Sequence, residues 1–144
     1  MADVLFTDLR LRFNENGADL DCNGFGSNSD AKPRRDIQTV SGLDNLAQAL
    51  KLRLLIPRGE LTQLGHPTYG SRVADLIGET LDRSNLELLR RYVRKALKSD
   101  PRVDDIVSLA VTAHRDFPGA VDVTAKVRAV TGDTVPLDLT MMLE

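Results

Sequence analysis

From residue 37 onward, the spacing of apolar residues changes once, at Pro101, and that change constrains the fold more than any other feature. Before Pro101, apolar side chains recur every three to four residues, as on one face of an α-helix. After it they alternate with polar side chains, as on a half-buried strand. The 144 residues, 42% of them hydrophobic, suffice for one domain with one core. We therefore expect an α+β fold with its helices ahead of its sheet.

Three helices are predicted before the change of spacing. The first follows Ser41 and ends before Pro57, whose ring clashes with the preceding turn of a helix. The second follows Ser71, and the third begins with Ser84 and Glu87 as a capping-box pair. The apolar residues expected to face the core are Leu43, Leu46, Ala47, Leu50 and Leu54 in the first helix, Val73, Leu76, Ile77 and Leu81 in the second, and Leu86, Leu89, Val93, Ala96 and Leu97 in the third.

Three strands are predicted after Pro101, with turns at 116–119 and 131–133. They form an antiparallel meander that packs one apolar face on the helices and leaves one polar face to water. The last strand carries Pro136 near its start and is expected at the sheet edge, where another protein can add a strand. The residues expected on the inner face are Val103, Val107, Leu109, Val111 and Ala113, with Asp105 as an exception, then Val121, Val123, Ala125, Val127 and Ala129, then Val135, Leu137, Leu139, Met141 and Leu143.

Residues 1–36 are predicted to form an N-terminal hairpin and a mobile loop, ahead of a larger α+β domain at 37–144. Apolar and polar residues alternate on both sides of a predicted turn at 14–17. Residues 23–35 are rich in Gly, Asn and Ser, which is typical of a surface loop. The apolar hairpin residues are Leu9, Leu11 and Phe13 on the first strand and Ala18, Leu20 and Cys22 on the second.

The segment 19–30 matches an EF-hand calcium loop at most ligand positions. Two residues argue against calcium, because Gly26 replaces the apolar residue at position eight and Asp30 replaces the longer Glu at position twelve. No helical pattern flanks the segment. Calcium binding stays an open alternative, and we assign no metal site.

The single cysteine, Cys22, excludes a disulfide within the chain and fits folding in a reducing cytoplasm. Residues 1–4 lack the basic and apolar regions that begin a signal peptide. No apolar stretch approaches the ~18 residues of a membrane helix. We therefore expect assembly in the cytoplasm, no membrane partner, and release by lysis if the protein leaves the cell.

The outer face of the third predicted helix is basic. Residues 83–102 hold seven basic and two acidic side chains, although the whole chain has a net charge of −2. Either this face is solvated, or Arg91, Arg94 and Lys95 meet an acidic partner. Nucleic-acid binding by the basic helix 84–98 is a weaker alternative, because the overall charge is negative and aromatic residues are few.

No catalytic constellation stands out. The chain has no GxSxG motif, phosphate loop or dinucleotide fingerprint. Glu60 with Asp75 or Glu79 would suffice for a glycosidase, but 21 acidic residues generate such pairs by chance. His66 and His114 have no cysteine or carboxylate companions at metal-ligand spacing. We predict no enzyme activity, no catalytic residue and no cofactor.

A set of short motifs in the middle of the chain resembles the small baseplate-wedge family of contractile phage tails. This family also serves type VI secretion and extracellular contractile injection systems, and is called the W-like or tail-lysozyme family. The resemblance covers about residues 37–143. The motifs, in order, are Leu46-Ala47-Gln48-Ala49-Leu50, Arg53-Leu54-Leu55, Pro57-Arg58-Gly59-Glu60, His66-Pro67-x-Tyr69-Gly70-Ser71 and Asp100-Pro101-Arg102-Val103.

The resemblance implies an α+β fold and a structural part in the baseplate. Its implied partners are the larger wedge proteins and the tail sheath protein, with inner tube or spike proteins as further candidates. The family's Glu-Pro-Arg motif maps onto Asp100, Pro101 and Arg102 as partner-binding residues, with Asp in place of Glu. The alternative implied by the family's lysozyme label is cleavage of peptidoglycan. The resemblance also marks a turn motif, whose residues are His66, Pro67, Tyr69 and Gly70.

Overall fold

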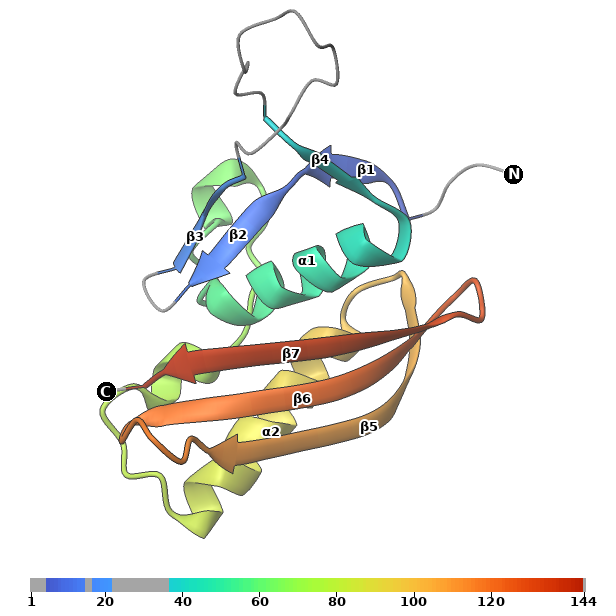
Figure 1. The fold of residues 1–144 in the computed structure, drawn as a ribbon. Coiled ribbons are helices and arrows are strands. Elements are labelled where there is room, and N and C mark those ends of the chain that lie inside the picture. Colours follow the sequence, from blue (N-terminus) through green and yellow to red (C-terminus); the bar gives the residue numbers. More distant parts are fainter. Residues whose placement is uncertain (1–4, 15–16, 22–36, 144) are drawn as a thin grey trace, which may run out of the picture.

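The structure, a computed structural model, describes residues 5–14, 17–21 and 37–143. The predicted loop at 23–35, Cys22 and most of the calcium-like segment 19–30 lie outside the described residues. Figure 1 shows a three-stranded sheet with one helix across its face, a second helix beside its upper strand, and short N-terminal strands beyond that helix. The α+β fold is confirmed, while several details of the prediction are wrong.

The C-terminal sheet follows the predicted meander. Its strands are β5 (Val103–Ala113), β6 (Ala120–Ala129) and β7 (Thr134–Met142), which pair in the order β5-β6-β7. Both pairs are antiparallel. Along β6 the buried valines alternate with exposed polar residues such as Lys126 and Arg128, so the sheet has one apolar and one polar face.

The prediction for β5 is wrong at Val107, which is 54% exposed, whereas Ile106 is buried. Two register shifts explain the difference, one before Asp105 and one before Ser108. Each such bulge adds one residue to a strand and so reverses which face the following side chains occupy. Ile106 consequently lies opposite the buried Val127 on the inner face.

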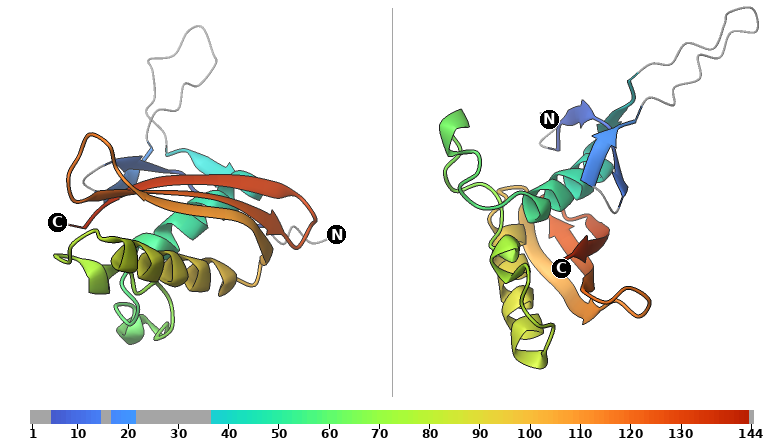
Figure 2. Two further views of the ribbon diagram at one scale, coloured as in Figure 1. Left: turned by 90° about the horizontal axis from the view of Figure 1, so that it is seen from below. Right: turned by 90° about the vertical axis from the view of Figure 1, so that its left-hand side faces the viewer.

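Two α-helices cover the inner face of the sheet, α1 (Gly42–Leu55) and α2 (Arg83–Lys98). Figure 2 shows α2 running along the sheet and α1 closing the core beside it. The predicted apolar faces are confirmed by buried residues Leu46, Leu50 and Leu54 in α1 and Leu89, Val93, Ala96 and Leu97 in α2. The cap of α2 is not Ser84 but Asp82, whose side chain accepts a hydrogen bond from Asn85 N at 2.8 Å.

The predicted helix after Ser71 is wrong. The segment holds only a single 3₁₀ turn, η2 (Val73–Leu76), and a similar turn, η1 (Thr62–Leu64), precedes it. Ile77, expected on the buried stripe, is extended and 60% exposed, and Gly78 follows it with a φ of +83°. The left-handed conformation of Gly78 ends the 3₁₀ turn after the buried pair Val73 and Leu76. No second helical turn follows to continue the predicted apolar face.

The N-terminal hairpin is present but shorter than predicted. Its strands are β2 (Leu11–Asn14) and β3 (Gly17–Leu20), which pair in antiparallel fashion. Leu9, assigned to the hairpin, instead belongs to β1 (Thr7–Leu9), which pairs with β4 (Thr39–Ser41). The change of partner occurs at Arg10, between the two short strands.

Two buried amides of α1 hold this N-terminal part in place. Gln48 accepts a hydrogen bond from Leu11 N at 2.8 Å and donates to Leu9 O at 2.7 Å, as a neighbouring strand would. Asn45 donates to Leu5 O at 2.8 Å. The boundary at residue 36 stays a prediction, but these bonds attach the hairpin to the helical layer. None of the helices that the structure describes is long and apolar enough to cross a membrane.

Candidate partner-binding surfaces

The junction of α2 and β5 carries the Asp100-Pro101-Arg102 motif. Asp100 is 1% exposed, so its carboxylate lies inside the protein. The guanidinium of Arg102 binds it as a fork, with Nε 3.0 Å from Oδ1 and Nη2 2.8 Å from Oδ2. The backbone N of Arg102 donates a third bond to Oδ1 at 2.9 Å. Aspartate is shorter than the glutamate of the family motif, and its carboxylate bonds to Arg102 within the same turn.

The local sequence explains why the chain turns here. Ser99 ends α2, and Pro101 cannot continue the helix. Val103 N then donates to Asp100 O at 3.1 Å, which starts β5. Val130 N, after β6, donates to Arg102 O at 2.9 Å. The motif thus ties the end of the helix to the sheet.

Arg53, at the end of α1, joins the motif to the rest of the fold. Its Nη2 lies 3.5 Å from Asp100 Oδ2, and its guanidinium carbon lies 4.4 Å from the centre of the Tyr69 ring. Three segments far apart in sequence therefore meet at one buried carboxylate. We call Arg53, Tyr69, Asp100 and Arg102 the Asp100 cluster. Arg53 belongs to the Arg53-Leu54-Leu55 motif, but no sequence signal distinguished it from the other arginines.

The electrostatics of the Asp100 cluster favour its charged form. Burial alone would raise the pKa of Asp100, but hydrogen bonds from the side chain and backbone of Arg102, and the charges of Arg102 and Arg53, outweigh it and lower the pKa. The side-chain hydrogen bond from Arg102 likewise raises the pKa of that arginine. Burial raises the pKa of Tyr69. The cluster is therefore an ion pair stabilised within the chain.

The turn motif positions Tyr69 through a close backbone approach at Gly70. Gly70 has a φ of +103°, and a Cβ there would overlap the carbonyl oxygen of Ile56. The next residue, Ser71, donates from its N to Ile56 O at 2.9 Å. His66 and Pro67 are exposed and lie outside the Asp100 cluster. Position 70 therefore requires glycine.

The basic face of α2 is exposed. Lys98 pairs with Asp105 at 3.4 Å and Arg90 pairs with Glu87 at 3.8 Å. Arg91, Arg94 and Lys95 have no acidic partner among the described residues. These three are the basic residues assigned from the sequence as partner-binding, and their role stays a prediction.

Hydrogen bonds at the two ends of the β6–β7 pair show which backbone groups of β7 face outward. Ala129 N donates to Asp133 O at 2.8 Å. Leu143 N donates to Gly119 O at 2.8 Å. The nine residue pairs between them run without a register shift, and bonded and non-bonded pairs alternate in an antiparallel ladder. Odd-numbered residues of β7 therefore bond to β6, and even-numbered residues direct N–H and C=O away from it.

The free edge of β7 consists of these outward groups, and the expected edge strand is confirmed. Pro136 has no N–H, so the edge lacks a donor there, and an unbroken run of donors begins at Asp138 and continues through Thr140 and Met142. No described residue bonds to the backbone N–H groups of this run. Beside it lies an apolar groove of about 220 Å³, whose wall includes Ile77 and Met142. The run of outward donors and the apolar groove lie at the same end of β7.

The conceivable catalytic and metal-binding residues are not gathered into a site. Glu60 and Glu79 are exposed, and Asp75 forms an ion pair with Arg72 at 2.9 Å. The ring of His114 accepts a hydrogen bond from Asp116 N at 3.0 Å and so stabilises the turn after β5. Within residues 5–14, 17–21 and 37–143, no group of three potential metal ligands comes together.

An open strand edge and an exposed basic helix face are surfaces for binding other proteins. Residues 9–132 match the family model of the contractile injection system sheath initiator. The chain therefore belongs to the sheath initiator family, and it is a structural component of a contractile injection system. The expected link to baseplate and sheath assembly is confirmed at this level.

A solved structure is similar in fold. A candidate tail lysozyme from Geobacter sulfurreducens matches with a TM-score of 0.61 and 20% sequence identity, covering 70% of this chain and 90% of that chain. At this identity the likeness shows the fold alone. No curated protein matches the chain.

Proposed function

We propose that this protein joins the wedge core bundle of a contractile-tail baseplate to the first sheath ring, and that it templates sheath assembly by strand pairing along β7. Family membership supplies the setting, in which members act with sheath and baseplate components. The observation that carries the proposal is the run of unpaired backbone donors from Asp138 to Met142. We infer that the particle is assembled in the cytoplasm.

Strand addition fits β7 better than β5, the other edge of the sheet. β5 contains two bulges, which interrupt the regular ladder that an added strand needs. Its charged residues also pair with neighbouring elements, as in the 2.9 Å contact of Arg128 Nε with Asp104 Oδ2. β7 has no bulge, and the adjoining apolar groove would receive an apolar side chain of the incoming strand.

The wedge-facing surface in this proposal is the outer side of α2 and the turn that follows it. Arg91, Arg94 and Lys95 would touch the larger wedge proteins, because their charges are unpaired among the described residues. Asp100 acts differently, since its buried carboxylate positions Arg102 and Arg53 instead of meeting a partner.

A proline at position 140 tests the strand pairing. Thr140 directs its N–H to the free edge, so Thr140→Pro removes one outward donor and leaves the backbone bonds to β6 intact. Thr140→Val is the matched control: both variants lose the hydroxyl bond to Asp122, but valine keeps the N–H. We expect particles carrying Thr140→Pro to have baseplates but few sheaths, whereas Thr140→Val particles have normal sheaths. Electron microscopy of the particles measures the sheathed fraction.

Thermal unfolding of both purified variants establishes that the monomer remains folded. Normal sheaths on Thr140→Pro particles, with the variant present in the baseplate, would mean that β7 is not the template for the sheath. Equal loss of sheaths in both variants would point to the hydroxyl contact instead.

A further inference from the structure

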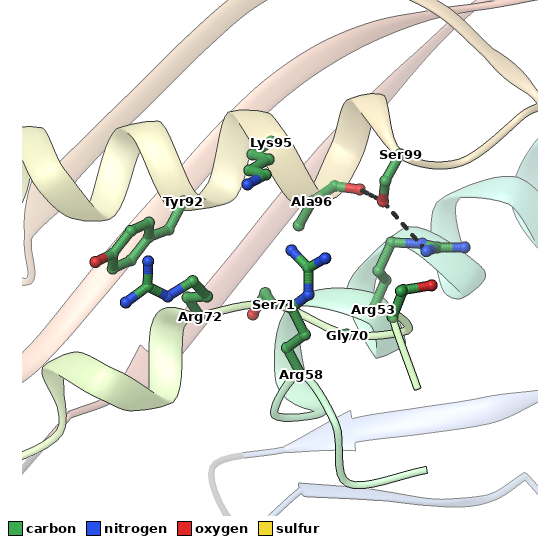
Figure 3. A pocket seen from close by; sticks show the side chains of 10 residues that line it. Arg53, Arg58, Gly70, Ser71, Arg72, Tyr92, Lys95, Ala96 and Ser99 are labelled. Carbon is green, nitrogen blue, oxygen red and sulfur yellow. Dashed lines mark hydrogen bonds between the residues drawn. The ribbon is translucent and has the colours of Figure 1, made fainter. Parts of the chain in front are cut away.

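A basic cleft lies between α2 and the chain that follows α1. It has a volume of about 180 Å³, and four of its ten lining residues are basic while none is acidic. Figure 3 shows the charged ends of Arg58 and Lys95 facing the same space from opposite walls. The basic lining residues are Arg53, Arg58, Arg72 and Lys95.

Two of these four charges already have partners. Arg72 pairs with Asp75 at 2.9 Å, and Arg53 lies 3.5 Å from the carboxylate of Asp100. Arg58 and Lys95 are exposed and form no ion pair with any described residue. The cleft therefore presents two uncompensated positive charges.

The positions of the Arg58 and Lys95 charges on facing walls of the cleft are unfavourable in the free protein. Like charges repel, and the repulsion is stronger beside protein walls than in open water. The backbone fixes one side of the arrangement, because Arg58 N donates to Ser71 O at 2.9 Å next to the close approach at Gly70. Arg53, which also lines the cleft, has a buried Nε with no hydrogen-bond partner among the described residues. An anion between the walls would relieve the repulsion.

We propose that this cleft binds a carboxylate from an acidic segment of a partner protein, held between Arg58 and Lys95. The exposed Arg91 and Arg94 on the same helix extend the positive surface beyond the cleft and would hold neighbouring acidic residues of that segment. The inference rests on the proposed assembly role for the identity of the partner. Carboxylate binding itself depends only on the cleft.

A protein carboxylate fits this surface better than nucleic acid. Single-stranded nucleic acid is bound by stacking bases on exposed aromatic rings. The aromatic ring among the ten lining residues is that of Tyr92, and the guanidinium of Arg72 already covers it, 4.8 Å from the ring centre.

The test is titration of the full chain with a synthetic hexaglutamate peptide at low salt, followed by calorimetry and by NMR of the arginine and lysine side chains. We expect the Arg58 and Lys95 signals to shift most. Arg58→Gln with Lys95→Gln should weaken peptide binding by at least about tenfold. Arg83→Gln with Arg115→Gln is the matched control, because it removes the same charge from exposed residues outside the cleft. This control should change the affinity by less than about twofold.

Three results would overturn the inference. The first is no measurable binding of hexaglutamate by the wild-type chain. The second is an equal loss in the cleft variant and the control variant, which would indicate attraction to net charge alone. The third is tighter binding of a single-stranded oligonucleotide that the cleft variant abolishes, which would identify nucleic acid as the occupant. The Thr140→Pro experiment involves neither Arg58 nor Lys95, so failure of strand pairing and failure of the cleft are separate outcomes.

Discussion

At the α2–β5 junction both oxygens of Asp100 accept hydrogen bonds from Arg102, whereas along β7 the outward N–H groups of Asp138, Thr140 and Met142 have no described partner. The first region is a polar group inside the protein, and the second is bare backbone at its surface. Both were assigned to partner binding from the sequence. Only the second offers groups that another chain can bind directly.

Asp100 supports the surface from the inside, whereas the outward backbone groups of β7 are themselves part of the surface. A buried ion pair contributes through the charges it would leave unpaired if one partner were lost. The outward N–H and C=O groups of an open strand edge form no hydrogen bonds within the sheet and can pair with another chain. Mutations in the two regions should therefore affect different measurements, stability in the first and assembly in the second.

Removal of the Asp100 carboxylate should give the largest loss of stability. Asp100→Ala leaves Arg102 and Arg53 partly buried without their counter-charge, and we expect a loss of about 3–5 kcal/mol in the free energy of unfolding. Asp138→Ala, at the β7 edge, should change it by less than about 0.5 kcal/mol. Urea denaturation measures both. A loss below about 1 kcal/mol for Asp100→Ala would mean that the cluster is not a structural ion pair.

The turn that positions Tyr69 should be nearly as sensitive. Gly70→Ala combines a left-handed φ with overlap of the Ile56 carbonyl, so we expect a loss of about 2–4 kcal/mol. Gly78→Ala is the control, since Gly78 also has a positive φ but a Cβ there would meet no atom of the described residues within 4 Å. Backbone strain alone should cost about 1 kcal/mol at that position. Equal losses would contradict the role of the close approach.

The pH dependence of stability should distinguish the cluster from surface carboxylates. The pKa of Asp100 is lowered in the folded protein, so its contribution is complete above the pKa of the unfolded chain and is lost as the pH falls through the folded value. The stability difference between wild type and Asp100→Asn should therefore be largest at neutral pH and shrink below about pH 4. Denaturation at pH 7 and pH 3 measures it. A difference that is independent of pH would contradict the charged form.

The parts of the fold that the sequence predicted are those with a long, regular pattern. The two α-helices and three long strands each repeat their apolar spacing several times, so the inward faces of α2 and β6 followed directly. In the segment after Ser71 the apolar spacing runs for only a few residues before Gly78, and that length is too short to distinguish a helix from a 3₁₀ turn. In β5 the alternation was read without bulges, although Asp105 stood as an exception on the inward face, where the first register shift lies.

The candidate surfaces divide in the same way. The β7 edge follows from chain order and from Pro136, both of which are visible in the sequence. The Asp100 cluster and the basic cleft depend on Arg53 and Arg58, whose neighbours come from segments far along the chain. Long-range contacts of this kind have no local signature. The motif marked Asp100 as partner-binding, and only the folded chain places its carboxylate in the interior.

Tyr69 gives the smallest effect that still tests the link between the turn motif and the cluster. Its hydroxyl has no hydrogen-bond partner among the described residues, so Tyr69→Phe should change stability by less than about 0.5 kcal/mol. Tyr69→Leu removes the ring under Arg53 and should cost about 1–2 kcal/mol, because the cation then loses an aromatic face in a half-buried site. A double-mutant cycle of Tyr69→Leu with Arg53→Met isolates the coupling between the two side chains. Zero coupling would mean that the turn and the carboxylate are neighbours without being connected through Arg53.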